Sequence, residues 1–339
     1  SGQASAEVVA ALIARLGALS RANSIQMYEA SHSLAELGRL GEMSGEALDT
    51  LITALSDSNC WVRNAVVRSL GELEHPSRDI TLALAAALGD SSWGVRHAAA
   101  ESLGKLGQAP AEVPGYVMAV LVVALSDSDP WVRQAAAESL GQLGQTSAEV
   151  PGYVETALIA ALVDTELHIR IAAADSLGQL GRVSEGVVTT LVAALDDSDH
   201  DVRYEAANSL GQLGQQSAEV MVALAGALSD SDVFVRLVAA GSLIQLGQTS
   251  AKVIMTLLEA LNNSDYTARQ MAASCLGQLE IEDETQFRLI LIALSHRLHD
   301  ASVHVRRAAL TAIRRLLDGR QIPGYHWVPI RERREKARK

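Results

Sequence analysis

Aromatic residues and cysteines are scarce in this chain. Aromatics make up 4% of the 339 residues, whereas 48% are hydrophobic, and the apolar side chains are largely alanine and leucine. Because this composition favours helix over strand, we expect an all-α fold. The two cysteines, Cys60 and Cys275, lie far apart, and neither belongs to a pair with metal-ligand spacing, which fits a reducing compartment.

Long apolar runs are also missing. The longest uncharged apolar stretch, residues 113–125, contains Pro114 and Gly115 and is shorter than the roughly 20 residues that a membrane-spanning helix needs. The first residues show no basic region followed by a hydrophobic core, so no secretion signal is visible. We therefore expect a soluble, cytoplasmic protein.

Positive charge is scarce except at the C-terminal end. Residues 288–339 hold 13 basic and 4 acidic residues, which leaves 15 basic and 36 acidic residues before them. Since phosphate backbones are bound mainly by lysine and arginine, this balance disfavours nucleic-acid binding along the body of the chain. The basic tail, residues 318–339, suits nucleic acid or an acidic partner, and the alternative is a solvated, partly disordered end.

An arginine recurs at a fixed place in a repeated phrase, of which residues 132–141, VRQAAAESLG, are an example. The steps between these arginines are 33 or 37 residues, and a fixed period in this range indicates a stacked repeat array, a solenoid. Solenoids mostly act through long curved surfaces, which favours a binding function. The recurring arginines are Arg63, Arg96, Arg133, Arg170, Arg203, Arg236, Arg269 and Arg306.

Each repeat has the pattern of a helical hairpin. In residues 217–247, Ser217 suits the N-cap of a first helix (helix A) that runs to about Leu228 with one apolar stripe. After a short polar turn, Asp232 suits the N-cap of a second helix (helix B) over about 233–246, and Gly247 suits a left-handed C-terminal cap. The Leu-Gly pairs are accordingly interpreted as helix ends rather than as nucleotide-binding motifs.

An aspartate stands six residues before almost every recurring arginine. We expect these pairs to form a ladder in which each arginine holds the aspartate of its own or of the adjacent repeat. The alternative is a row of catalytic carboxylates, but catalysis needs one special place and this pattern is everywhere. The aspartates are Asp57, Asp90, Asp127, Asp164, Asp197, Asp230 and Asp300, with Asn263 as the exception.

The phrase VRxAAAxSLGxLG, preceded by an Asp-Ser-Asp turn, resembles the HEAT repeat, and in particular the short subclass named after phycobilisome lyases. The resemblance implies a right-handed α-solenoid (superhelix) of about nine helix-turn-helix repeats over residues 1–317, followed by the tail 318–339. The family includes scaffolds, bilin lyases, a metal-dependent hydroxylase and sensor regions of nucleotide-binding proteins. The expected repeats are 5–38, 44–73, 77–106, 111–143, 148–180, 184–213, 217–246, 250–279 and 283–317.

Three positions of helix B differ most between repeats: three and two residues before the arginine and one after it. They share one helix face, and seven of the 12 aromatic residues lie there. Because aromatics dominate interface hot spots, we expect this helix-B ridge to bind a protein or peptide; the alternative is that the rings pack over the turns. The candidates are Tyr28, Trp61, Trp93, His97, Trp131, Gln134, His168, Tyr204, Phe234 and Tyr266.

A tetrapeptide, residues 114–117, recurs at 151–154 and accounts for 37-residue spacing. We expect about one extra turn at the start of helix A or, more simply, a lengthened loop; Tyr116 and Tyr153 there suggest a small contact patch. The first helix, residues 6–19, is apolar on most sides, so we expect an upstream domain or a homodimer to cover it.

No catalytic, cofactor-binding or metal-binding residue is assigned. The hydroxylase relatives carry His-Glu dipeptides, and none occurs here; His296, His299 and His304 cluster near the last hairpin, where a metal site or solvent-facing histidines are the alternatives. We expect a non-enzymatic interaction scaffold, in one version the C-terminal sensor module of a larger bacterial signalling protein of the NACHT/STAND type. The alternative is a bilin lyase or chaperone acting on phycobiliproteins.

Overall fold

A computed structural model describes residues 6–18, 32–33, 36, 45–73, 77–106, 114–147 and 149–318. These residues form α-helices and no strand, so the predicted all-α solenoid fold is confirmed. The helices are α1 (Ala6–Ala18), α3 (Gly45–Ala54), α4 (Cys60–Gly71), α5 (Arg78–Ala87), α6 (Trp93–Leu106), α7 (Pro114–Ala124), α8 (Pro130–Thr146), α9 (Gly152–Ala161), α10 (Leu167–Leu180), α11 (Glu185–Ala194), α12 (His200–Leu213), α13 (Ala218–Ala227), α14 (Val233–Gln245), α15 (Ala251–Ala260), α16 (Tyr266–Leu276), α17 (Glu284–Arg297) and α18 (Val303–Asp318).

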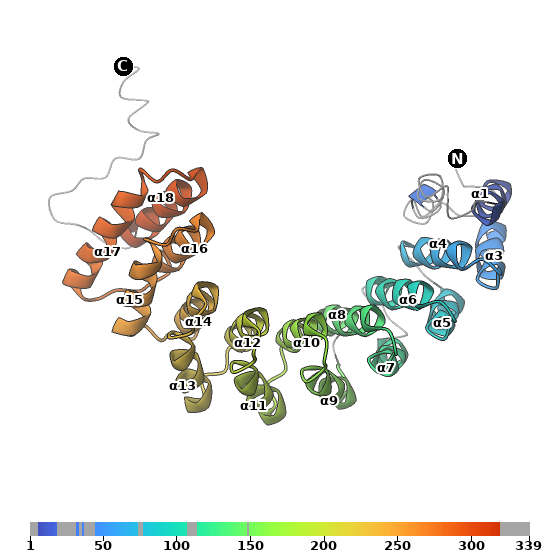
Figure 1. The fold of residues 1–339 in the computed structure, drawn as a ribbon, viewed down its shortest axis with the longest axis horizontal. Coiled ribbons are helices and arrows are strands. Elements are labelled where there is room, and N and C mark those ends of the chain that lie inside the picture. Colours follow the sequence, from blue (N-terminus) through green and yellow to red (C-terminus); the bar gives the residue numbers. More distant parts are fainter. Residues whose placement is uncertain are drawn as a thin grey trace, which may run out of the picture. The chain divides into compact units, whose positions relative to one another are not determined.

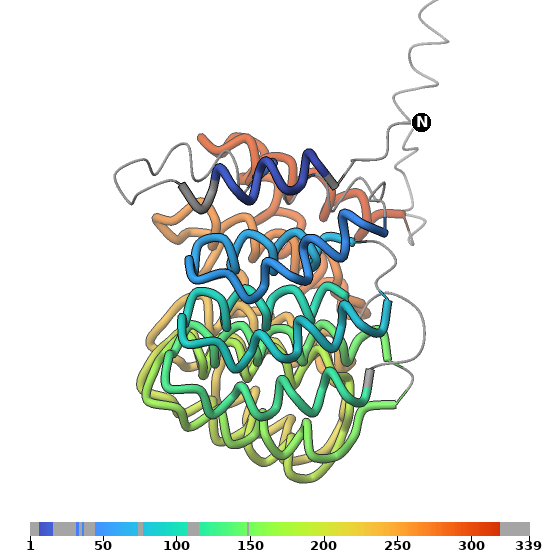
Figure 2. The backbone as a smooth tube through the Cα atoms, turned by 90° about the vertical axis from the view of Figure 1, so that its right-hand side faces the viewer, coloured from blue at the N-terminus to red at the C-terminus, as the bar shows by residue number. Residues whose placement is uncertain are grey.

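The described helices group into two compact units, and the boundary between them falls after Gln215 in the sequence. In the first unit the A helices α3, α5, α7, α9 and α11 form one row and the B helices α4, α6, α8, α10 and α12 form the other (Figure 1). Figure 2 shows the first hairpins of this unit, coloured blue to green, as successive layers. In the second unit α13, α15 and α17 are the A helices, and α14, α16 and α18 are the B helices.

The helix ends follow from local capping chemistry. In the α13–α14 hairpin, the Ser217 hydroxyl accepts the N–H of Val220 at 3.2 Å, and Asp232 accepts the N–H of Phe234 at 2.7 Å. Helix α14 ends at Gln245, one residue earlier than predicted, and Gly247 has φ 74°, the predicted left-handed cap. Glu166 holds the N-cap position of α10, where the α14 helix has Asp232, and it makes no side-chain cap bond.

The Leu-Gly glycines have two roles, so their interpretation as helix ends is only half right. Gly181 has φ 63° and closes α10, but Gly141 lies inside α8. A Cβ added to Gly141 would lie 2.7 Å from the Oγ of Ser176 on α10 and 2.9 Å from its Cα. The same hydroxyl donates to the carbonyl of Ala137 on α8 at 2.8 Å. The absence of a side chain therefore lets neighbouring B helices approach more closely than the A helices do.

This glycine–serine contact recurs along the first unit and forms a seam between its B helices. The Oγ of the following serine lies 2.3–2.7 Å from the Cβ position at each glycine. The seam consists of Gly71 with Ser102, Gly104 with Ser139, Gly141 with Ser176 and Gly178 with Ser209.

The recurring tetrapeptide does not add a turn to helix A. Helices α7 and α9 have 11 and 10 residues, against 10 in α11 and α13. Before α9, the additional residues instead lengthen α8, which has 17 residues, and the connection after it. The hydroxyl of Tyr153 donates to the carbonyl of Gly115 at 3.0 Å, which links the two copies, and Tyr116 and Tyr153 both remain exposed.

Candidate protein-interaction surface

The recurring arginines connect successive hairpins. Arg133 donates from Nε and Nη2 to the two carboxylate oxygens of Asp164 in the next repeat, at 2.8 and 3.0 Å. Its Nη1 also donates to the carbonyl of Asp127 in its own turn at 2.9 Å. One guanidinium thus fixes its own turn and the adjacent one. The same arrangement joins Arg63 to Asp90, Arg96 to Asp127, Arg170 to Asp197 and Arg269 to Asp300.

The aspartates of these rungs are engaged on several sides. Besides Arg133, the Asp164 carboxylate accepts the N–H of Glu166 at 2.9 Å. Burial alone would raise the pKa of Asp164, but the hydrogen bond and charge of Arg133 together with the Glu166 N–H outweigh it and lower the pKa. The ionised carboxylate is therefore held in place, which supports a structural role over a catalytic one.

One rung of the second unit has an amide in place of the carboxylate. Arg236 donates to the carbonyls of Asp230 and Ser231 in its own turn at 2.7 and 3.0 Å, but its counterpart in the next repeat is Asn263, and no hydrogen bond joins the two side chains. Arg306 makes the same own-turn contact, to the carbonyl of Asp300 at 2.7 Å. Arg203 also donates to the carbonyl of Asp197 in its own turn, at 3.0 Å. At the start of the ladder, the Asp57 carboxylate accepts the N–H of Asn59 at 2.7 Å.

Three tryptophans lie at the N-terminal ends of successive B helices of the first unit. Trp61, Trp93 and Trp131 are in the first turns of α4, α6 and α8, and 47%, 52% and 51% of their surfaces are exposed. Packed helices lie about 8–10 Å apart, so the three rings form a row with one ring per repeat. Half of each ring is covered, and the other half is available to a partner.

Polar side chains hold the positions beside these rings. The amide of Asn64 donates to the carbonyl of Gly94 at 2.6 Å and so bridges α4 and α6. His97 lies 3.6 Å from Glu101, which also pairs with Arg68 at 3.2 Å. The tryptophan row therefore has a polar border, the usual composition of an interface rim.

The row continues to α10 through a stacked pair. The rings of Trp131 and His168 have centroids 4.9 Å apart and an interplanar angle of 20°. Gln134, one turn further along α8, donates to Glu138 at 2.7 Å. The stacking covers part of Trp131, but the indole remains half exposed.

The other candidate residues of the ridge are placed separately. Tyr204 is half-buried in α12, and Phe234 is half-buried in α14 of the second unit. Tyr266 in α16 is 50% exposed, and its ring centroid lies 6.1 Å from that of His304. Tyr28 lies outside the described residues. The structure thus brings Trp61, Trp93, Trp131 and His168 into one row within the first unit.

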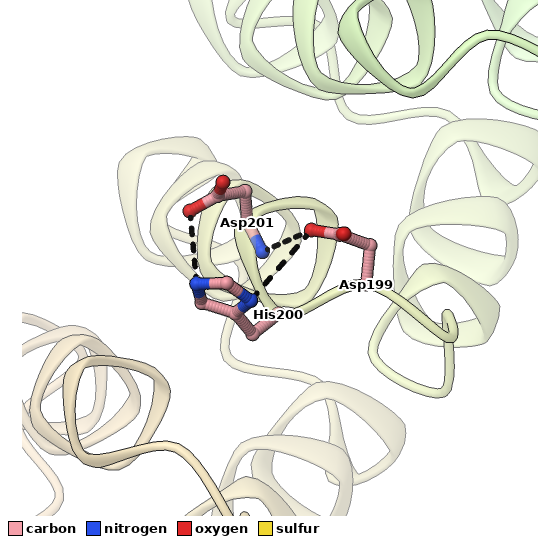
Figure 3. A group of neighbouring side chains, drawn as sticks. All are labelled: Asp199, His200 and Asp201. Atoms are coloured by element: carbon pink, nitrogen blue, oxygen red, sulfur yellow. Dashed lines mark hydrogen bonds and ion pairs between the residues drawn. The ribbon is translucent and has the colours of Figure 1, made fainter.

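Three consecutive residues at the start of α12 form the one group of potential metal ligands found in the described part of the chain (Figure 3). The His200 nitrogens lie 3.8 Å from Asp199 and 3.6 Å from Asp201. Asp199 already accepts the N–H of Asp201 at 2.9 Å as the helix cap, and His200 and Asp201 are exposed. This chemistry is that of a capped helix start. His296, His299 and His304 do not assemble into such a group.

Glu205 on α12 is a half-buried acid that is not among the candidates predicted from the sequence. Burial raises the pKa of Glu205 on α12, and the nearby charges of Asp175 and Asp201 add to this effect, while a hydrogen bond from Asn208 opposes it. Glu205 stands two residues after Arg203, a position at which four other repeats have a buried alanine, so an acid in that place is the sequence signal that could have found it. The alanines are Ala65, Ala98, Ala135 and Ala172.

Antiparallel helix hairpins, tied to one another by residues at equivalent positions, define an α-solenoid. The chain belongs to the HEAT-repeat family: the family model for HEAT repeats matches residues 48–115, 81–151, 118–211, 154–244 and 220–314. No curated protein matches the sequence. No described helix combines the length and the hydropathy that crossing a bilayer requires.

Solved structures show the same fold. The YibA protein of E. coli is similar with a TM-score of 0.57 and 19% identity, over 88% of this chain and 97% of that one. A model of the full-length AP-3 complex gives 0.66 and 12%, over 89% and 55%. Kap95p, in its complex with RanGDP, gives 0.61 and 14%, over 92% and 47%. At these identities the likeness is one of fold.

Proposed function

We propose that this HEAT-repeat chain is a non-enzymatic scaffold that binds a protein partner on its helix-B ridge, with Trp61, Trp93 and Trp131 as the anchors. The observation that carries the proposal is the row of three half-exposed indoles in consecutive repeats. Large aromatic side chains that are well supported yet accessible are the usual hot spots of protein interfaces.

The surroundings of the row support a protein as the ligand. A folded partner needs an apolar centre and a polar rim, and Asn64, His97 and Glu101 supply polar groups beside the indoles. The ladder and the glycine–serine seam hold successive B helices in fixed register, so the three rings are preorganised and lose little entropy on binding. Among the structural neighbours, Kap95p binds RanGDP and induces its switch loops to adopt the GTP-bound conformation.

The test begins with site-specific photo-crosslinking. A photoreactive residue in place of Trp93 should capture the partner, and the same residue in place of Tyr153 should not. Tyr153 is a matched control because it is an aromatic residue of similar exposure, in the same unit, at the start of an A helix instead of a B helix.

The purified partner is then titrated against variants of the full chain. Replacement of each anchor by alanine should cost about 2 kcal/mol, roughly 30-fold in Kd, whereas Tyr116→Ala with Tyr153→Ala should leave Kd unchanged. A triple tryptophan variant that loses much thermal stability but binds the partner normally would show that the rings only pack over the turns.

A further inference from the structure

A hollow of about 320 Å³ lies between the B helices α16 and α18 of the second unit. Gln270 and Ser274 line it from α16, and Arg307, Thr311 and Arg315 line it from α18. The floor includes Ala312, which is buried against Gly277: a Cβ added to this glycine would lie 2.6 Å from the Cα of Ala312. Small residues at the base therefore leave room between the two rows of polar side chains.

The hollow has positive charge without a counter-charge. Arg307 and Arg315 are exposed, and neither has a hydrogen bond or an ion pair in the described part of the chain. No carboxylate is among the residues that line it. Arg306, the neighbour of Arg307, shows the contrast, because its guanidinium donates to the carbonyls of Asp300 and Ala301 at 2.7 and 2.9 Å.

The spacing of the two guanidinium groups selects the kind of anion. Eight residues along an α-helix span about 12 Å, too far for one carboxylate or one phosphate to bind both. An extended peptide advances about 3.3 Å per residue, so side chains four residues apart lie about 13 Å apart and on the same face. Two acidic side chains at that separation match Arg307 and Arg315, while Gln270, Ser274 and Thr311 can bond the peptide between them.

From this geometry we propose that the α16–α18 hollow binds an acidic segment of a partner protein in extended conformation, with carboxylates four residues apart that pair with Arg307 and Arg315. The chain's own C-terminal residues 319–339 are unsuited to this site because they hold seven basic residues against two acidic ones. A nucleic acid is the alternative ligand, and the experiment below distinguishes it from an acidic peptide. The site does not depend on the tryptophan row, which lies in the other unit.

The experiment uses the full chain and a fluorescein-labelled peptide with two glutamates separated by three glycines or serines. Anisotropy at low ionic strength should show binding that falls about tenfold in the double variant Arg307→Gln with Arg315→Gln, the combined effect of two exposed ion pairs. The matched control is Arg314→Gln with Arg288→Gln, which changes the net charge equally at two exposed arginines outside the hollow. Binding to the control should equal that of the unaltered chain.

A second variant distinguishes loss of the binding site from misfolding of the double variant. Thr311→Glu leaves both arginines in place and puts a carboxylate at an exposed position in the hollow. It should also weaken binding of the probe, because the new carboxylate repels the glutamates. A probe with adjacent glutamates should bind more weakly than the spaced one. Replacement of Trp61, Trp93 and Trp131 by alanine should leave probe binding unchanged. This control distinguishes failure of the hollow as a binding site from failure of the helix-B ridge.

Three outcomes would overturn the proposal. The first is an equal loss of peptide binding in the Arg307→Gln, Arg315→Gln variant and in the Arg314→Gln, Arg288→Gln control. The second is a loss of peptide binding only when the tail arginines Arg331, Arg333 and Arg334 are replaced by glutamine. The third is an oligonucleotide or inorganic phosphate that binds through Arg307 and Arg315 more tightly than the spaced peptide does.

Discussion

The interface between α8 and α10 in the first unit and that between α14 and α16 in the second occupy the same place in the repeat but are built differently. At α8–α10, Arg133 binds both carboxylate oxygens of Asp164. At α14–α16 the equivalent pair is Arg236 and Asn263, with no hydrogen bond between the side chains. An amide in place of a carboxylate removes both the charge and the second acceptor oxygen that a guanidinium fork needs.

The glycine–serine seam is lost at the same interface. Gly141 of α8 lies against Ser176 of α10, but α14 has Ile244 and α16 has Cys275 at the equivalent positions. A Cβ added to the nearest glycine, Gly241, would lie 3.6 Å from the Sγ of Cys275, an ordinary contact. Burial raises the pKa of Cys275 to about 11, so the thiol stays neutral and acts as a small apolar group.

The difference indicates that the arginine–aspartate rung and the glycine–serine contact together set how closely neighbouring B helices pack. Where both are missing, α14 and α16 pack less closely than α8 and α10, and a cavity of about 70 Å³ lies beside Arg236 and Asn263. In a solenoid each repeat depends on its neighbours alone, so a weak interface is not compensated elsewhere. We expect α14–α16 to be the first interface to open in hydrogen exchange within the second unit.

The largest effect should come from filling the seam. Gly141→Ala places a Cβ 2.9 Å from the Cα of Ser176 in α10, so the helices must separate, at a cost of about 2–3 kcal/mol. Gly226→Ala is the control: it also lies within a helix but has open space, so it should stabilise by about 0.5–1 kcal/mol. Denaturant unfolding measures both, and a Gly141 variant as stable as the unaltered chain would disprove the role of the seam.

Removing the arginine should have unequal effects at the two interfaces. Arg133→Gln breaks a bidentate ion pair and leaves the mostly buried Asp164 without its guanidinium, at a cost of about 2 kcal/mol. Arg236→Gln loses only bonds to the carbonyls of its own turn, at about 0.5–1 kcal/mol. Unfolding free energies compare the two, and equal losses would mean that the rung adds nothing beyond the turn.

The smallest effect should come from restoring the missing rung. Asn263→Asp supplies a carboxylate opposite Arg236 and should stabilise the second unit by about 0.5–1 kcal/mol, with slower hydrogen exchange in α14 and α16. The gain should vanish when Arg236→Gln is added.

The pH dependence of this gain provides a further control. Arg236 should lower the folded-state pKa of the new carboxylate, as Arg133 does for Asp164. The stabilisation is then complete above the unfolded pKa of about 4 and lost as the pH falls through the lower folded value. A gain that persists at lower pH would point to a cause other than the ion pair.

The repeat and its hairpins were predictable because their information is local. Caps such as Ser217 and Asp232 and the left-handed Gly247 depend on residues within one turn, and the structure agrees with them to within one residue. For the recurring tetrapeptide the sequence left two alternatives, an extra turn of helix A or a lengthened loop. Spacing shows that residues are added but not whether a helix or its connection takes them up, and before α9 it is α8 and the connection that are longer.

The candidate surface was predictable only as a set of positions. Counting from the arginine located Trp61, Trp93 and Trp131, yet their half exposure and the stacking of Trp131 on His168 depend on how adjacent helices are rotated. The raised pKa of Glu205 and the α16–α18 hollow depend on distances between different repeats. The hollow leaves no pattern in the sequence, whereas Glu205 stands where four other repeats have a buried alanine.

The sequence alone determined that this chain is an array of helix pairs, because a period of 33 or 37 residues, an alanine- and leucine-rich composition and helix caps at fixed places together indicate this architecture. Tertiary structure decided which oxygens each arginine binds, which glycines close a helix and which admit a neighbour, and where an uncompensated positive charge remains. These properties depend on close approach between side chains about 30 residues apart, and only packing brings such residues together.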